Sequence, residues 1–387
     1  MSHARLTGTY LLGPEAVVVI ERDGEPALST LGVPEEYAAR LVPDGSAFRI
    51  DGGVLAGTSV SFADGDPCPG GLIGGMLPLA RAPEEMEFPG GRGLQAPVLD
   101  VTPAEEERFR TLLEEIRIDP EGGLLDVEGP RWRFVEWLTR QDAVIFHGSP
   151  KPDIEVFAPV RKSVEIQDIA GTGNLAAVYG TPSGLWALWF AVLDRSDLHG
   201  SIQNGVLRWT NREGRDLDVY FFSVHHEYVG REIWRPGTLY LLPREQFRPL
   251  PFFPGGPDSF EWASADEVRP LKRIAVEPED FPFRDQVGGH DDSAVIDADR
   301  LSDVVLSHVR GARRIEGGLE LAIAWDDDVA GVFDDYVALT ANLTPDVERR
   351  LVSRSAADAT LEVRAPEGFL QSFELSLARR GIDVETA

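Results

Sequence analysis

Hydrophobic and polar residues alternate in short runs over the first part of the chain, and turns containing glycine separate the runs. Alternation with a period of two is typical of strands that bury one face, and its even spacing predicts a small antiparallel barrel or sandwich. We therefore predict an all-β domain over residues 1–86. Its strand-like runs are Thr7–Leu12, Ala16–Glu21, Ala27–Leu31, Ala47–Ile50, Ser59–Phe62 and Gly71–Ala80.

The pattern then changes from strands to helices. Ala82–Pro97 is rich in Pro, Gly and Glu, which is typical of a linker. Thr102-Pro103-Ala104-Glu105 forms a capping box with proline in the first turn, and it predicts a helix that runs to about Ile116. A second helix is predicted over Pro130–Arg140. Residues 87–140 thus comprise a linker and helices.

Residues 141–288 are predicted to form a second folded domain. Ala143–Pro150, with sequence AVIFHGSP, is an apolar run stopped by Gly and Pro, which predicts a buried strand that ends at a turn. Leu185–Leu193 is apolar on every side and predicts a buried helix. Ser259–Trp262 and Val268–Val276 have the pattern of a hairpin. Further strands are predicted at Val206–Trp209, Val219–Val224 and Thr238–Pro243.

Residues 289–387 are predicted to form a small α/β domain. Its expected elements are helices at Ala298–Val309, Val329–Leu339 and Phe369–Arg380, with strands at Leu319–Ile323 and Thr360–Val363. Because the helices up to the end of the central domain fall mostly before its strand-rich part, the expected fold class is α+β multidomain.

The chain is strongly acidic. Its 387 residues include 37 basic and 65 acidic side chains, which give a formal net charge of −28. Such a charge repels phosphate backbones and counts against tight sequence-independent binding of nucleic acid, which needs several Lys or Arg contacts. No run approaches the 18 apolar residues of a membrane span, and the N-terminus lacks the apolar core of a secretory signal. We expect a cytoplasmic protein that does not bind membranes.

Metal binding is not predicted. The single cysteine, Cys68, excludes an internal disulfide and every zinc pattern with several cysteines. Two adjacent histidines on a strand point to opposite faces, so His225-His226-Glu227 is interpreted as structural. The three acids that follow Trp325 are interpreted as a solvated cap before a helix.

Three short motifs occur in chain order: F-H-G-S at Phe146–Ser149, V-Y-G-T at Val178–Thr181, and F-E-W at Phe260–Trp262, followed by V-R-P. Together they resemble the His-Tyr-Glu branch of the ADP-ribosyltransferase family, which includes diphtheria-toxin-like enzymes and poly(ADP-ribose) polymerases. The resemblance covers about residues 144–285 and implies a split β-sheet domain. It also implies NAD⁺ as substrate and a catalytic set of His147, Tyr179 and Glu261.

The resemblance implies a role for each residue of the motifs. Glu261 would stabilise positive charge on the ribose as nicotinamide leaves, and it would accept a hydrogen bond from the 2′-hydroxyl. Tyr179 would stack on nicotinamide. The backbone of Gly148 and the hydroxyl of Ser149 would bind the carboxamide, and His147 would donate to the adenosine ribose.

The predicted NAD-binding set also includes Thr181 and Tyr220. Tyr220 is one of three candidates, with Phe221 and Tyr240, for a second stacking aromatic. Ser259 stands two residues before Glu261, where arginine-modifying members carry Glu or Gln, so we expect a different acceptor. A protein or a small molecule fits the acidic chain better than nucleic acid does.

Residues 7–82 resemble the small lipocalin-like β-barrel appended to serine-hydrolase-like proteins, through the order of strands and the pieces L-x-P-D-G and V-x-F. This resemblance implies an accessory domain without chemistry of its own. Two alternatives to an NAD⁺-cleaving transferase or glycohydrolase stay open. One is a catalytically silent NAD- or nucleotide-binding module that acts through protein contacts, and the other is a structural or interaction protein that does not bind NAD⁺.

Overall fold

The computed structural model describes residues 3–12, 15–53, 55–75, 77–84, 92–120, 123–160, 174–196, 198–252 and 258–385. The fold is α+β, and the chain divides into two compact units. The first comprises Met1–Val156, Tyr179–Trp262 and Arg269–Asp291, and the second comprises Phe157–Val178, Ala263–Val268 and Asp292–Ala387. None of the described helices is long and apolar enough to cross a membrane.

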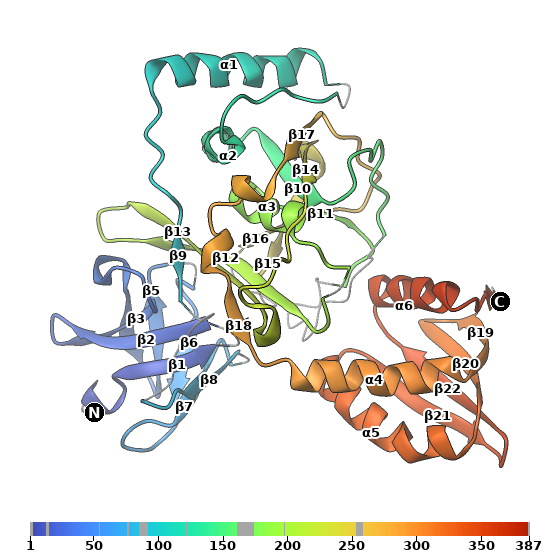
Figure 1. Cartoon of the computed structure of the whole chain (residues 1–387). Coiled ribbons are helices and arrows are strands. Elements are labelled where there is room, and N and C mark those ends of the chain that lie inside the picture. The colour runs from blue at the N-terminus through green and yellow to red at the C-terminus, as the bar shows by residue number, and fades with distance from the viewer. Residues whose placement is uncertain are drawn as a thin grey trace. The chain divides into compact units, whose positions relative to one another are not determined.

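The N-terminal strands form a closed antiparallel barrel, in which each strand pairs with the next and the first pairs with the last (Figure 1). The prediction of a small barrel is therefore confirmed. Its strands are β1 (Gly8–Leu12), β2 (Glu15–Arg22), β3 (Glu25–Thr30), β4 (Ala39–Asp44), β5 (Ala47–Asp51), β6 (Ser59–Phe62), β7 (Gly70–Ile73) and β8 (Leu77–Arg81).

Local sequence explains the tight hairpin between β2 and β3. Asp23 and Gly24 both have positive φ, 57° and 80°, which is the backbone of the two-residue turns that match the twist of paired strands. Inside the barrel, Tyr10 is fully buried, and its hydroxyl donates to the carbonyl of Leu6 at 2.7 Å. Burial and the nearby Cys68 raise the pKa of Tyr10 to about 12.

Two helices follow the barrel: α1 (Pro103–Ile118) and α2 (Arg131–Thr139). The capping box that the sequence predicts is present, since Thr102 accepts from the backbone N–H of Glu105 and the Glu105 carboxylate accepts from the backbone N–H of Thr102. Glu105 also accepts from the guanidinium of Arg133 at 2.9 Å, which ties α1 to α2. Residues 85–91 of the expected linker lie outside the described residues.

The central region contains three small sheets and the buried helix α3 (Gly184–Val192). In one sheet the order is β10 (Val144–Ser149), β14 (Gly237–Pro243), β17 (Lys272–Val276), and in the second it is β11 (Val178–Gly180), β16 (Asp258–Ser264), β15 (Arg248–Pro251). The third joins β12 (Ile202–Thr210), β13 (Asp216–His225) and β18 (Gly288–His290), with β9 (Leu94–Gln95) also paired to β13.

One strand pairing differs from the prediction. The expected hairpin between Ser259–Trp262 and Val268–Val276 is wrong, because β17 pairs with β14 while β16 pairs with β11 and β15. A contact of Lys272 in β17 ties this strand to α1 instead. The buried ammonium of Lys272 lies 2.6 Å from the carboxylate of Asp119, the C-cap of α1. A long-range ion pair of this kind leaves no local pattern in the sequence.

The hairpin of β12 and β13 also packs against the barrel, because Leu207, Trp209 and Val219 are buried within the same apolar cluster as Tyr10 and Val19. Two exposed ion pairs join the same elements, Arg212 with Asp23 at 3.1 Å and Arg215 with Glu36 at 3.2 Å. The barrel and the hairpin of β12 and β13 are therefore packed together, in agreement with their place in a single compact unit.

The second unit is built on a five-stranded sheet of order β21-β22-β20-β19-β23. All its pairs are antiparallel except β19 with β23, so this unit is α+β rather than the expected α/β. Asp326 caps α5 by accepting from the N–H groups of Asp328 and Val329, which confirms the cap expected there. The elements are α4 (Ser293–Ser307), β19 (Val309–Ile315), β20 (Gly318–Ala324), α5 (Asp327–Leu343), β21 (Glu348–Arg354), β22 (Asp358–Arg364), α6 (Glu367–Arg379) and β23 (Val384–Glu385).

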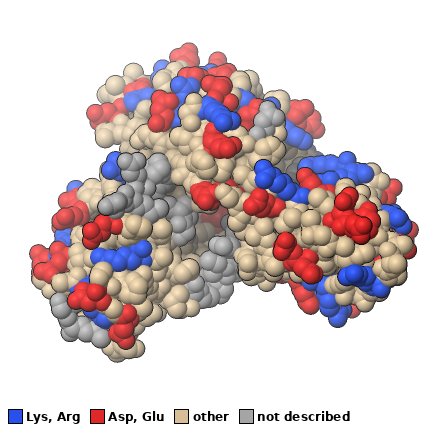
Figure 2. Space-filling model, turned by 60° about the horizontal axis from the view of Figure 1, so that its bottom comes forward, with Lys and Arg blue, Asp and Glu red and all other residues tan. Residues whose placement is uncertain are grey.

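Short 3₁₀ helices complete the described chain. They are η1 (His3–Arg5), η2 (Glu35–Tyr37), η3 (His226–Tyr228), η4 (Arg244–Gln246), η5 (Pro278–Asp280) and η6 (Arg284–Gln286). Acidic and basic side chains are interspersed over the face of the molecule shown in Figure 2, and they form no continuous band of one sign there.

Candidate functional site

The strand that carries His147 lies between two neighbours. On one side β10 pairs with β14 along its whole length, which places His147 opposite Tyr240. On the other side the backbone of Phe146 exchanges two hydrogen bonds with Thr181, at 2.8 and 3.0 Å. This antiparallel bridge is isolated, so the ladder between β10 and the segment of β11 begins and then stops.

The side chain of His147 takes the place of the next backbone pair in this ladder. The register that pairs Phe146 with Thr181 would pair Gly148 with Tyr179 two residues further on. Instead, Nδ1 of His147 lies 2.8 Å from the carbonyl oxygen of Tyr179. A carbonyl only accepts, so Nδ1 carries the hydrogen and donates it to Tyr179. The expected hydrogen bond from His147 to the adenosine ribose stays a prediction.

Gly148 lies next to the point where the pairing of the two strands stops. Backbone groups alternate along a strand, so the N–H and C=O of Gly148 point to the same side as those of Phe146, toward Tyr179. A Cβ at this position would overlap the Ala187 carbonyl oxygen and the Ala191 nitrogen of α3. The absent side chain therefore serves close packing of the helix, whereas the sequence interpretation assigned it to ligand approach.

The strand that carries Glu261 is the next neighbour. Sheet order places β16 directly beside β11, so His147, Tyr179 and Glu261 lie on three successive strands: β10, β11 and β16. The guanidinium carbon of Arg208 lies 5.0 Å from the centroid of the Phe260 ring, and that of Arg244 lies 4.3 Å from the centroid of the Trp262 ring. Because side chains alternate along a strand, Glu261 points to the opposite face from these two rings. Its side chain is half-buried.

Two predicted hydroxyls support the backbone around the site. Ser149 is 8% exposed, and its Oγ accepts from the N–H of Lys151 at 3.2 Å. Thr181 is buried, and its Oγ1 accepts from the N–H of Ser183 at 3.0 Å. These bonds fix the chain where it leaves β10 and where it enters α3, so both residues hold the geometry of the strands that carry His147 and Tyr179.

Tyr220 lies apart from this group. Its ring is 1% exposed, stacks against Phe222 and contacts Phe283, and its hydroxyl lies 3.3 Å from Oγ of Ser183. Burial raises the pKa of Tyr220 well above its usual value. No face of the ring is open to a ligand, so the structure places Tyr220 in the core rather than in an NAD-binding surface.

The sequence interpretation missed the role of Tyr240. Its hydroxyl donates to the carbonyl of Lys151 at 2.6 Å and accepts from the N–H of Ile154 at 3.0 Å. The ring is fully buried, which raises the pKa of the phenol and excludes ligand stacking. Tyr240 thus holds the chain that follows Ser149. Only the pairing of β14 with β10 reveals this, because the two partners are far apart in sequence.

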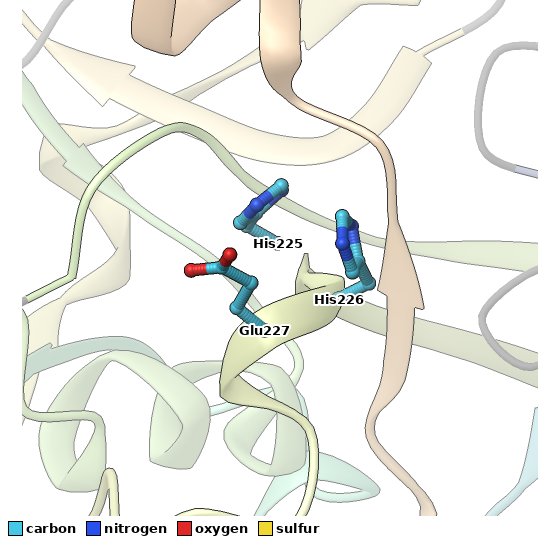
Figure 3. Close-up of side chains that lie close together, drawn as sticks. All are labelled: His225, His226 and Glu227. Carbon is cyan, nitrogen blue, oxygen red and sulfur yellow. The ribbon is translucent and has the colours of Figure 1, made fainter.

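The interpretation of His225 and His226 changes as well. Strand β13 ends at His225 and η3 begins at His226, so the alternation of a strand does not separate them. Their ring centroids are 4.1 Å apart, and Glu227 lies beside them (Figure 3). Ligand atoms of all three residues lie within 4.8 Å of one another. The expectation that these histidines point to opposite faces is therefore wrong.

Comparisons with models of protein families, with curated proteins and with solved structures found no match to this chain. The resemblance of the three motifs to ADP-ribosyltransferases therefore stays a prediction. The residues that carry it are brought onto neighbouring strands, and the function proposed below rests on that geometry and on the chemistry of the side chains.

Proposed function

We propose that this protein cleaves the bond between nicotinamide and ribose in NAD⁺, and passes the ADP-ribose group to an acceptor or to water. One observation carries the proposal: the imidazole of His147 bonds to the carbonyl of Tyr179 where the ladder between their strands stops, and Glu261 lies on the adjoining strand. The three residues that the motifs single out by type thus also share one part of the fold.

The strands β10 and β11, at the point where their pairing stops, offer groups that suit nicotinamide. Its carboxamide needs one donor and one acceptor, and the peptide groups of Gly148 point toward the side where the ladder to β11 is interrupted. Tyr179 is the aromatic residue of β11, and its side chain is half-buried, so part of it remains exposed. An aromatic ring on this strand can stack on the planar pyridinium.

Glu261 supplies the charge that the reaction needs. The C1′–N bond breaks, its electron pair goes to the nicotinamide nitrogen, and positive charge develops over C1′ and the ring oxygen of the ribose. A carboxylate at that face stabilises this charge and accepts a hydrogen bond from the 2′-hydroxyl. A lone pair of the acceptor then forms the new bond to C1′, and the acceptor loses a proton. With water as acceptor, the products are ADP-ribose and nicotinamide.

The acceptor class follows from charge and from Ser259. A net charge of −28 disfavours an extended nucleic-acid contact, and basic and acidic groups are mixed on the face in Figure 2. The hydroxyl of Ser259 accepts from the N–H of Glu261 at 3.0 Å, so it supports the local backbone and adds no second carboxylate that would bind an arginine. We propose a protein or small-molecule acceptor other than arginine.

The test is nicotinamide release from NAD⁺ by the purified chain, with Glu261→Gln alongside. We expect release to fall by roughly 100- to 1,000-fold, as is usual when one group that stabilises transition-state charge is lost. NAD⁺ affinity should stay within a few-fold, because the amide keeps the shape of the carboxylate. Glu267→Gln is the matched control, an exposed acid six positions on, and it should leave release unchanged.

A catalytically silent NAD-binding module is the second candidate. Tyr220 and Tyr240 are closed to ligands, so of the three candidates for a second stacking ring, which an enzyme and a silent module would both use, only Phe221 is partly exposed. No nicotinamide release, together with saturable NAD⁺ binding that His147→Ala abolishes, would establish the silent module. If the chain neither releases nicotinamide nor binds NAD⁺, both candidates are wrong and an interaction protein remains.

A further inference from the structure

We propose that His225, His226 and Glu227 bind one divalent transition-metal ion of the zinc type. This site is separate from the proposed NAD⁺ chemistry and does not depend on it. Two imidazoles and one carboxylate are the ligands that zinc accepts in sites with three protein ligands, which leave a fourth position for water or another ligand.

The end of a strand brings these consecutive residues together. Within β13 successive side chains would point to opposite faces, but the backbone turns into η3 immediately after His225. Figure 3 shows His226 and Glu227 on either side of His225. Their ligand atoms lie within 4.8 Å of one another, and ligands at about 2.0–2.1 Å from a tetrahedral ion are roughly 3.3 Å apart. The exposed side chains of His226 and Glu227 would rotate to close that difference when an ion binds.

His225 is the fixed member of the site. It is 5% exposed, and β13 is paired on both sides near this point, with β12 through Val224 and with β18 through His225 itself. The ring of Tyr228 packs near it edge-on, with centroids 6.3 Å apart. One ligand held by the fold and two on the adjoining exposed turn give a site that is anchored yet open to an incoming ion.

Gly289 lets the neighbouring strand pass close to this turn. A Cβ at Gly289 would come 3.1 Å from the Cα of His226 and 2.9 Å from the side chain of Val229. The turn that carries His226 and Glu227 is thus packed against β18 and does not hang free in solvent. Such support restricts the positions of both exposed ligands before an ion arrives.

A second group, His308 with Asp326 and Asp328, is a weaker candidate. Nδ1 of His308 bonds to the carbonyl of Val304 at 2.8 Å, and its Nε2 already lies 3.1 Å from the Asp326 carboxylate. Asp326 also accepts two backbone N–H groups as the cap of α5. Because these bonds already use ligand atoms of His308 and Asp326, a metal ion would have to break them.

The test is a zinc titration of the full chain after a chelator has removed any bound metal. Calorimetry and competition with a chromophoric chelator measure the affinity. We expect one high-affinity Zn²⁺ per chain. His226→Ala and Glu227→Gln should each weaken it by roughly tenfold or more, since even supporting groups around a metal are worth about 10- to 100-fold. Both residues are exposed, so the variants keep the core intact, whereas the buried His225 is left unchanged.

Three variants serve as matched controls. His199→Ala and Glu232→Gln remove an exposed histidine and an exposed acid outside the site, and His308→Ala removes the histidine of the second group. All three should bind Zn²⁺ like the parent chain. Bound Zn²⁺ should also raise the melting temperature of the parent more than that of His226→Ala. The proposal is overturned if the parent does not bind Zn²⁺, or if both site variants bind it as tightly as the parent.

Discussion

The barrel and the seam between β10 and β11 use the same backbone chemistry with opposite outcomes. Every neighbouring pair of barrel strands is joined by a ladder, and the first strand closes on the last. The seam has one bridge, between Phe146 and Thr181. Beyond it, the His147 imidazole bonds to the Tyr179 carbonyl, which a continued ladder would have paired with backbone. A complete ladder satisfies its own polar groups, whereas an interrupted one turns peptide groups toward partners outside the ladder.

Adding one carbon atom to a glycine in each region should destabilise the protein most. Gly70→Ala in β7 would drive a Cβ into the Leu79 carbonyl, and Gly148→Ala in β10 would drive one into the Ala187 carbonyl. Each contact is with backbone, so we expect a loss of about 1–3 kcal/mol or more in the free energy of unfolding. Denaturant unfolding measures it.

The two glycine variants should differ in NAD⁺ binding. NAD⁺ binding per folded molecule should survive Gly70→Ala and should weaken in Gly148→Ala, because only Gly148 lies at the interrupted seam. Gly331→Ala, within α5 and with nothing near the added carbon, is the control and should stabilise by about 0.5–1 kcal/mol. Equal NAD⁺ binding by both destabilised variants would remove the distinction between the regions.

A smaller effect is expected from one buried hydroxyl in each region. Tyr10→Phe loses the bond to Leu6 in the barrel, and Tyr240→Phe loses the bonds to Lys151 and Ile154 after β10. Each should cost about 1 kcal/mol of unfolding free energy, measured by denaturant titration. Only Tyr240→Phe should also weaken NAD⁺ binding, since Tyr10 supports no part of the seam. A matching loss in Tyr10→Phe would contradict this.

The smallest effect belongs to a partly buried ion pair outside both ladders, between Glu105 and Arg133. Hydrogen bonds from Arg133 and then from Thr102 lower the pKa of Glu105 from 4.5 to about 2. The folded state therefore favours the carboxylate, so the stabilisation is fully present above about pH 4.5 and is lost as the pH falls toward about 2. The difference in melting temperature between the parent and Glu105→Gln should shrink over that range.

Glu107→Gln, an exposed acid on the same helix, provides the control for this pH profile. Its melting curve should follow that of the parent across the range. A constant difference between the parent and Glu105→Gln down to pH 2 would show that the carboxylate is not selectively stabilised by Arg133 and Thr102.

Local pattern accounts for much of the barrel and of the first helix. Alternation predicts most barrel strands, and Thr102 with Glu105 predicts the start of α1. β4 is missed because Pro43 is typical of a turn, yet it pairs with Phe48 at the end of a hairpin. The run Gly71–Ala80 is predicted as one strand but contains β7 and β8, which a turn separates.

Charged strands are the other class of omission. β19 and β21 carry many arginines and show no apolar run, so the pattern does not predict them. Arg313 pairs with Glu320 on β20 at 2.7 Å, and Arg350 pairs with Glu362 on β22 at 2.8 Å. These strands depend on partners across the sheet, which only the folded chain provides.

Patterns along the chain were enough to predict the residue types of the candidate site, the strand that carries His147 and the buried helix after Tyr179, because each depends on neighbours along the chain. The folded chain was needed to place Tyr179 beside His147, Glu261 on the next strand and Tyr220 in the core. It was also needed to bring the rings of His225 and His226 close together. Sheet register, the points where strands end and the packing of α3 on Gly148 arise between distant segments, so a local pattern does not record them.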